Sequence, residues 1–237
     1  MAAKRPEAIV FDTFGTVVDW RGSLIADLAA FGRHRGITAD WAALVDAWRA
    51  AYHPSMDRVR RGELPWTRLD DLHRASLDGL VQEHRIVGLT EADRCHVTLA
   101  WHRLNPWPDS VPGLTRLKRH FIIGPLSNGN VSLLTRMAKH AGLPWDIVFG
   151  SDLFEHYKPD PETYLGVCRL LDLEPAQVMM AAAHNRDLAA ARKLGLMTAF
   201  FPRPTEYGPN QTRDLRAEDD WDIIAGDIED MAARLAA

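Results

Sequence analysis

Four strand-like apolar runs of this sequence are each followed by a polar or charged group that could do chemistry. Asp12 follows the first run, Ser127 and Asn128 close the second, Lys158 lies in a loop after the third, and Asp187 comes soon after the fourth. The carboxyl ends of parallel strands meet at one edge of an open α/β sheet, where ligands bind. We therefore expect a carboxylate nucleophile, a cation and hydrogen-bonding groups to lie together.

Each of these positions also has an ordinary structural explanation. An acid after a strand commonly caps a turn or a helix, and Asp187 alone is most simply a helix N-cap. Ser-Asn-Gly at residues 127–129 is a common turn sequence, and Lys-Pro-Asp at 158–160 is typical of surface loops. The order of all four along one predicted sheet edge favours a site.

The elements that would position these groups alternate between strand and helix from about residue 118 to the end. Short, continuously apolar runs predict strands that are buried on both faces of a parallel sheet. We expect strands over 8–12, 121–127, 147–150, 178–183, 197–201 and 221–225, and helices over 131–141, 162–171 and 187–194. The predicted fold is a Rossmann-like α/β core with helices on both faces.

Residues 17–110 show helical spacing of apolar residues and no convincing strand. Helices are expected over 24–35, 41–52, 66–83 and 90–104, and the chain is expected to return to the sheet near 111–113. The predicted organisation is a core of residues 1–16 and 111–237 with a helical cap domain of residues 17–110 inserted after the first strand.

The ordered motifs resemble those of the haloacid dehalogenase-like hydrolases. They are Phe11-Asp-Thr-Phe-Gly-Thr16, Leu126-Ser-Asn-Gly129, Tyr157-Lys-Pro-Asp160 and Ala183-His-Asn-Arg-Asp187. The resemblance implies a nucleophilic Asp12, a Lys158 that keeps it ionised, and a helical cap.

Most members of that superfamily are phosphatases, which resemble one another in a second Asp two residues after the nucleophile. Here that position is Phe14, whose ring can neither protonate a leaving alkoxide nor accompany a hydrated Mg²⁺. The run 181–187 also supplies only one acid. We therefore expect no metal and no cofactor, with a Mg²⁺-dependent phosphatase as the alternative.

The branch without that acid is the (S)-2-haloacid dehalogenases, since a halide leaves without protonation. The resemblance then implies a hydrolase acting on carbon–halide bonds, which converts short 2-haloalkanoic acids to 2-hydroxy acids with inversion through an ester on Asp12. The retention of Asp12, Lys158 and Asp187 argues against a binding protein that has lost catalysis.

The resemblance assigns roles to further residues. The catalytic group would comprise Asp12, Thr16, Lys158 and Asp187, with His184 or Asn185 orienting water; the substrate would contact Thr13, Phe14, Arg49, Ser127, Asn128 and Tyr164. The alternative interpretation of Arg49 is an exposed charge on the cap. That of Tyr164 is an aromatic side chain of a helix that packs in the core.

Some positions depart from the branch. Ala182 and His184 stand where Ser and Asn are usual, and Arg186 replaces an aromatic residue. His184 and Asn185 are hydrogen-bond donors that suit fluoride, the smallest and most strongly hydrated halide, as it leaves. We therefore expect haloacetates to be substrates, with fluoroacetate as a candidate among them.

Composition limits the partners. With 28 basic and 32 acidic residues the net charge is −4, which argues against binding to nucleic acid, and Arg58-Val-Arg-Arg61 is typical of a solvated helix end.

Two widely separated cysteines and no signal-peptide or membrane-span pattern predict a soluble cytoplasmic protein. Five Trp between residues 41 and 107 suggest packing within the cap and an interface, either between cap and core or between subunits. A homodimer is therefore one of the expected arrangements.

Overall fold

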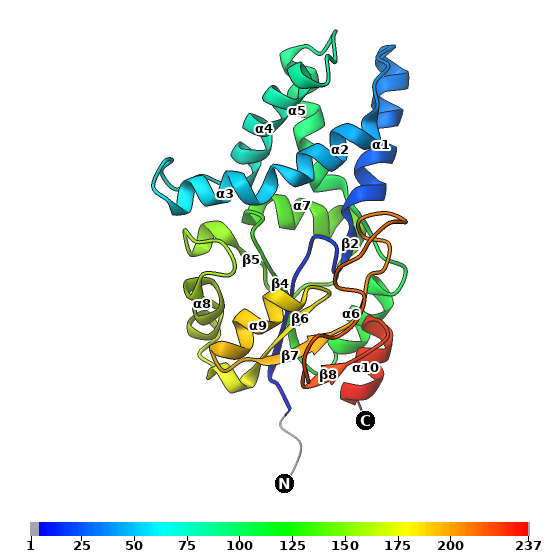
Figure 1. The fold of residues 1–237 in the computed structure, drawn as a ribbon. Coiled ribbons are helices and arrows are strands. Elements are labelled where there is room, and N and C mark those ends of the chain that lie inside the picture. The colour runs from blue at the N-terminus through cyan, green and yellow to red at the C-terminus, as the bar shows by residue number, and fades with distance from the viewer. Residues whose placement is uncertain (1–4, 237) are drawn as a thin grey trace.

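The computed structural model describes residues 5–236 and contains a six-stranded parallel sheet in the order β5-β4-β1-β6-β7-β8 (Figure 1). Every run expected to form a strand does so, with ends one to three residues shorter in most cases. The strands are β1 (Ala8–Phe11), β4 (Ile122–Ser127), β5 (Phe149–Gly150), β6 (Val178–Ala182), β7 (Met197–Phe200) and β8 (Ile223–Ile224).

Strand β1 is buried on both faces and separates two apolar layers. Ile9 and Phe11 pack on one side with side chains of α6 (Ser110–Leu117), α7 (Val131–Ala141) and α10 (Ile228–Ala236). Ala8 and Val10 face the opposite layer, with α8 (Pro161–Leu171) and α9 (Asn185–Lys193). The alternation is the two-residue period of a strand, and it confirms the predicted α/β core with helices on both faces.

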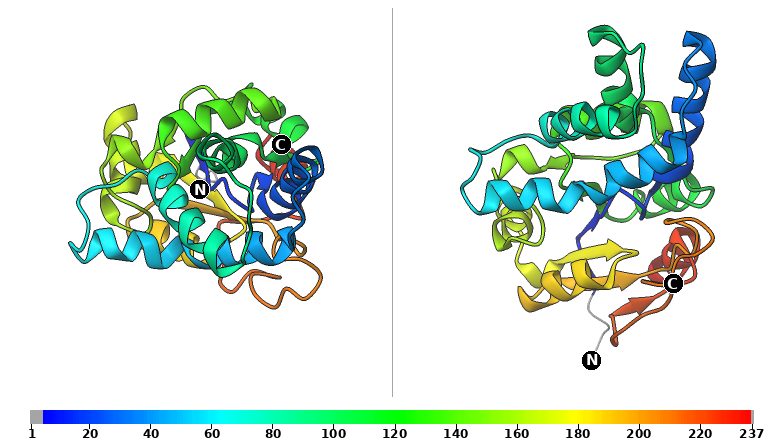
Figure 2. Two further views of the ribbon diagram at one scale, coloured as in Figure 1. Left: turned by 90° about the horizontal axis from the view of Figure 1, so that it is seen from above. Right: turned by 45° about the horizontal axis from the view of Figure 1, so that its top comes forward.

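A group of helices lies beyond the carboxyl ends of the central strands (Figures 1 and 2). Large buried aromatic side chains, among them Trp20, Trp48 and Trp101, pack at its centre. The helices are α1 (Trp20–Arg35), α2 (Trp41–Ala50), α3 (Tyr52–Arg60), α4 (Leu69–Glu83), α5 (Glu91–Thr98) and the 3-10 helix η1 (Leu99–Arg103). This layer covers the sheet edge at which the polar motifs end.

The expectation that residues 17–110 contain no strand is wrong in one detail. The chain leaves the core through β2 (Val18–Asp19) and returns through β3 (Asn105–Pro106), which pair antiparallel. Two-residue strands are too short to show a hydrophobic period, so the sequence pattern misses them. We propose the core and cap boundaries given above because both connections pass through this pair.

Helices α6 and α10 were not predicted. Helix α6 begins at Ser110, where only the return of the chain to the sheet was expected, near 111–113, and α10 follows the last strand. Proline is tolerated in the first turn of a helix, because the N–H it lacks has no partner there. These two helices pack on each other beside the sheet.

Candidate active site

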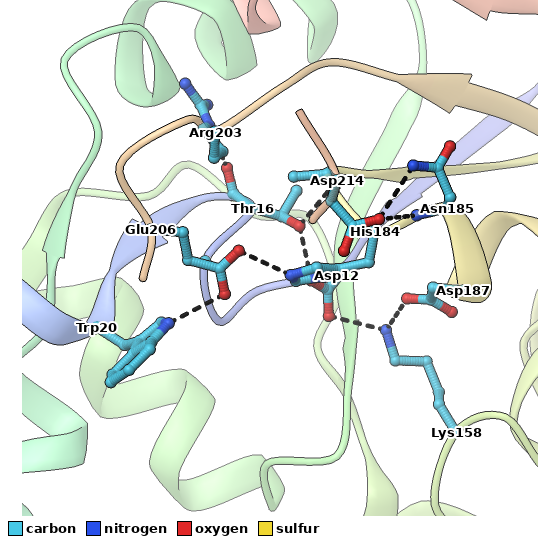
Figure 3. Close-up of polar contacts among 12 residues, drawn as sticks. Asp12, Thr16, Trp20, Lys158, His184, Asn185, Asp187, Arg203, Glu206 and Asp214 are labelled. Carbon is cyan, nitrogen blue, oxygen red and sulfur yellow. Dashed lines mark hydrogen bonds and ion pairs between the residues drawn. The ribbon is translucent and has the colours of Figure 1, made fainter. Parts of the chain in front are cut away.

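The polar groups after β1 and β6 and in the loop before α8 come together at the carboxyl edge of the sheet (Figure 3). Lys158 Nζ donates to Asp12 Oδ1 at 2.9 Å and to Asp187 Oδ2 at 2.5 Å. The other oxygen of Asp187 accepts from the Tyr164 hydroxyl at 2.6 Å. One buried cation therefore joins two carboxylates that lie 175 positions apart in the sequence.

The second oxygen of Asp12 accepts two hydrogen bonds. Thr16 Oγ1 donates to Oδ2 at 2.6 Å, and His184 Nδ1 lies 2.9 Å from the same atom. Thr16 is itself held by the backbone N–H of Ala183, which donates to its Oγ1 at 3.0 Å. Oδ1 thus has one donor and Oδ2 has two, so the two carboxylate oxygens are not equivalent.

These contacts determine the ionisation of the site. Burial alone would raise the pKa of Asp12, but the charge of Lys158, the His184 contact and the Thr16 hydrogen bond hold it well below its usual range. Burial would likewise lower the pKa of Lys158, yet Asp12 and Asp187 raise it above its usual value. The resting site therefore holds an ionised carboxylate beside an ammonium group.

The other predicted residues from the sheet edge divide into two groups. Asn128 lines the cavity, and its Oδ1 accepts the backbone N–H of Lys158 at 2.6 Å, so it also fixes that loop. Phe14 lines the cavity as well, with its ring edge-on to Tyr52 and Trp101. Thr13 and Ser127 are buried, and the Ser127 hydroxyl accepts from the backbone N–H of residue 129.

A cavity of about 430 Å³ separates the sheet edge from α2 and α3, and Arg49 is its cationic residue from α2. The guanidinium lies over the rings of Tyr52, at 4.3 Å, and Trp20, at 5.3 Å. Its Nη1 is buried and has no hydrogen-bond partner among the described residues. A buried donor without a partner is costly, which favours an anionic ligand as its missing partner.

The side chain of Asn185 does not contact Asp12. It binds the loop between β7 and β8: the amide donates to Asp214 Oδ1 and to the carbonyl of Arg216, and its oxygen accepts from Trp221 Nε1. Asn185 is not among the cavity-lining residues, whereas its neighbour Arg186 is. The expectation that Asn185 orients water is therefore wrong, because all of its amide atoms hold this loop.

Glu206 is a site residue that the sequence did not reveal. It comes from the loop after β7, is 1% exposed, and places Oε2 2.9 Å from His184 Nε2 while accepting from Trp20 Nε1 at 3.0 Å (Figure 3). Gly15 permits this approach, since a Cβ there would lie 2.1 Å from Glu206 Oε1. The loop carries no motif, so only the fold brings the residue to His184.

Both ring nitrogens of His184 consequently face carboxylates. Burial alone would lower the pKa of His184, but Glu206 and Asp12 raise it well above its usual value. The expectation that this residue donates to a departing halide is wrong, since neither nitrogen is free for one.

Residues 6–195 match the family model described as haloacid dehalogenase-like hydrolase. The chain belongs to the haloacid dehalogenase-like hydrolases. This membership accounts for the order Asp12, Ser127, Lys158 and Asp187 along the sheet edge, and it confirms the resemblance drawn from those motifs.

Several proteins similar to this hydrolase are dehalogenases by name. The L-2-haloacid dehalogenase PA0810 is 55% identical, with a TM-score of 0.95 over 98% of this chain and 99% of that one. The defluorinating L-2-haloacid dehalogenase Rha0230 is 50% identical, with a TM-score of 0.95 over 98% and 96%. The (S)-2-haloacid dehalogenase 1 of Pseudomonas sp. strain CBS-3 is 29% identical over 84% of this chain and 87% of its own length.

Proposed function

We propose that this hydrolase removes halide from short (S)-2-haloalkanoic acids, haloacetates included, and forms the 2-hydroxy acid with inversion. The observation that carries the proposal is an ionised Asp12 in the same cavity as Arg49, whose buried Nη1 has no hydrogen-bond partner within residues 5–236. The two groups supply a nucleophile and a receiver for an anionic leaving group. The 55% and 50% identical relatives named as dehalogenases support this assignment.

In the first step Asp12 attacks the carbon that bears the halogen from the side opposite the halide. The lone-pair count favours Oδ1 as the attacking atom, since Oδ2 already accepts from Thr16 and His184. The C–halogen bond breaks as the new C–O bond forms, and the halide leaves with both bonding electrons toward Arg49 and Asn128. No proton is needed, so Phe14 can occupy the position of a general acid.

The substrate carboxylate requires a second anion site. We assign it to Lys158, the Ser127 hydroxyl and the backbone N–H groups of Thr13 and Phe14, because cations and amides together bind carboxylates. Tyr164 contributes indirectly, since its hydroxyl fixes Asp187, the partner of Lys158. Water then cleaves the ester on Asp12 and releases the hydroxy acid.

The test is halide release from chloro- and bromoacetate and from both enantiomers of 2-chloropropionate, followed by the configuration of the product. We expect release from the haloacetates and the (S) enantiomer, and lactate of the (R) configuration. If no halide is released from any of these substrates and phosphate is released from p-nitrophenyl phosphate, the phosphatase alternative would replace the proposal.

Fluoroacetate forms a separate arm of the same assay. The support for including it is the 50% identical defluorinating relative. Hydrogen bonding from His184 to fluoride does not support it, because both ring nitrogens of His184 face carboxylates, those of Asp12 and Glu206. Chloride release without fluoride release would exclude fluoroacetate and leave the dehalogenase proposal in place.

A further inference from the structure

We infer that His184, positioned by Glu206, forms with Thr16 the oxyanion site in which the ester on Asp12 is hydrolysed. The inference rests on the proposed function and concerns its second step. It assigns a donor role to His184 and a positioning role to Glu206, which does not itself contact Asp12.

The geometry around Asp12 Oδ2 is that of an oxyanion site. Two side-chain donors converge on this oxygen, Thr16 Oγ1 at 2.6 Å and His184 Nδ1 at 2.9 Å. If Oδ1 has bonded to the substrate carbon, Oδ2 is the carbonyl oxygen of the ester. It becomes the negatively charged oxygen when water adds, and donors already in place stabilise that charge without reorganisation.

The proton on Nδ1 follows from the partner of Nε2. Glu206 is buried, its Oε1 is held by Trp20, and its Oε2 faces Nε2 at 2.9 Å. An ionised carboxylate can only accept, so Nε2 must donate to it, and Nδ1 must carry its own proton to donate to Asp12. Once Asp12 is esterified, Glu206 is the carboxylate that still stabilises the doubly protonated ring.

Glycine at position 15 makes this arrangement possible. Its φ of 87° lies in the left-handed region, and its missing Cβ leaves the space that the Glu206 carboxylate occupies. The motif loop after β1 thus supplies the nucleophile and also admits the residue that orients His184. An ordinary packed histidine would need neither a buried carboxylate nor this approach.

The bonds of the hydrolytic step balance as follows. Water adds to Asp12 Cγ, the Cγ–Oδ2 π pair moves onto Oδ2, and Asp187 takes the proton of the water. Collapse restores the Cγ–Oδ2 double bond and breaks Cγ–Oδ1, so Oδ1 leaves as the product alkoxide and takes a proton from Lys158. Asp187 returns its proton to Lys158 through their 2.5 Å contact, and Asp12 loses one proton to solvent.

The experiment separates the two steps with chloroacetate in rapid-quench mode. It measures chloride per active site and, by intact mass, the ester on the protein. Glu206→Gln and His184→Asn should release a first equivalent of chloride at nearly the wild-type rate. They should then turn over about 10²-fold more slowly with the ester accumulated, as for loss of one oxyanion donor. His34→Asn and Glu229→Gln, both exposed, are the matched controls.

A pH profile distinguishes positioning from a structural role. The charged groups that face His184 are Asp12 after β1 and Glu206 in the loop after β7; Lys158 acts on the first and Arg49 on the second. In wild type the hydrolytic rate should fall only as His184 loses its proton at high pH. In Glu206→Gln the same fall should occur at lower pH, because the carboxylate that raises the His184 pKa is gone.

Thr16 gives an independent check if either variant fails to fold. Thr16→Val should accumulate the ester and Thr16→Ser should not, since only the serine keeps a donor to Oδ2. A first step slowed as much as turnover, with no accumulated ester, would overturn the inference, as would an unshifted pH profile in Glu206→Gln. Absence of chloride release by wild type would instead refute the proposed function, so the two failures are distinguishable.

Discussion

Asp12 has a distinct partner set for each of its oxygens, and this difference decides where an isotope must go. Hydrolysis at Cγ sends Oδ1 out with the product and leaves an oxygen from water in the carboxylate. In a single turnover in heavy-oxygen water, the label should therefore appear in Asp12 and be absent from the product. Mass spectrometry of the peptide containing residue 12 measures it, with Asp12→Asn as the unlabelled and inactive control. Label in the first-turnover product would mean direct attack of water on the substrate.

Arg49 combines the positive charge that the proposed function requires with an unfavourable burial. We expect Arg49→Met to lower kcat/KM by about 10²-fold, because charge that develops on the halide loses its cation. The same change should leave Tm equal or higher, since methionine can pack on Tyr52 and Trp20 without burying a donor that lacks a partner. Thermal denaturation and halide release measured on one preparation test both. A clear fall in Tm would show that the guanidinium stabilises the cap.

At the residue scale, sequence reasoning succeeded where a motif specifies both type and position. Asp12, Lys158 and Asp187 meet as expected because each follows a strand end. Glu206 could not be found, since the contact with Trp20 spans 186 positions and the loop that carries it has no periodic pattern. Asn185 and His184 were assigned to water and halide because the sequence cannot show that both already have partners.

Among the elements, α3 is where the cap reaches the loop that carries Lys158. Arg60 donates to the carbonyl oxygens of Tyr157 and Lys158, at 3.1 and 2.7 Å, and pairs with Asp160. The basic run 58–61 is thus more than the solvated helix end that its composition suggested. The sequence could not distinguish Arg60 from Arg58, because the contacts of Arg60 with Tyr157, Lys158 and Asp160 arise only when the loop before α8 approaches α3.

This contact predicts a selective effect on substrate binding. Arg60→Ala should raise KM roughly fivefold with little change in kcat, since about 1 kcal/mol of cap–core hydrogen bonding is lost while Asp12 keeps its partners. Arg58→Ala is the matched control in the same helix, because Arg58 is exposed and pairs only with Glu63, at 3.4 Å, among the described residues. Equal effects of the two substitutions would remove the special role of Arg60.

The six strands were predictable because each is apolar and is bounded by turn residues. Strands β2 and β3 were not, since a pair of residues carries no period. Helix α3 was missed, because the expected helix over 41–52 ends where α3 begins and Pro54, a residue typical of helix ends, lies in the first turn of α3. Boundaries of this kind are determined by packing, which the sequence pattern does not contain.

For the molecule as a whole, we expect activity to survive chelation. Phe14 stands where the phosphatase resemblance requires an acid, and Lys158 supplies the positive charge beside Asp12. Within residues 5–236, no three His, Cys, Asp or Glu side chains are placed to hold a metal ion. Halide release after prolonged dialysis against EDTA should equal that of the untreated protein. Loss of activity that Mg²⁺ restores would return the protein to the phosphatase alternative.

The whole molecule also leaves some earlier predictions open. Residues 5–236 contain no helix long and apolar enough to cross a membrane, whereas cytoplasmic location and homodimerisation stay predictions. The buried tryptophans of the helical layer pack mainly against one another and against residues of the site, so they do not by themselves indicate a subunit interface.

The antiparallel pairing of β2 with β3 has an evolutionary consequence. Because the outgoing and returning connections lie side by side, the segment between them can lengthen, shorten or be exchanged without separating β1, which precedes Asp12, from the rest of the sheet. A lineage can therefore diversify its substrates by replacing a cassette and keep the bond-breaking chemistry unchanged. Under the proposed function, Arg49 belongs to the exchangeable part and Asp12 to the retained part, so leaving-group preference can change while the nucleophile is kept.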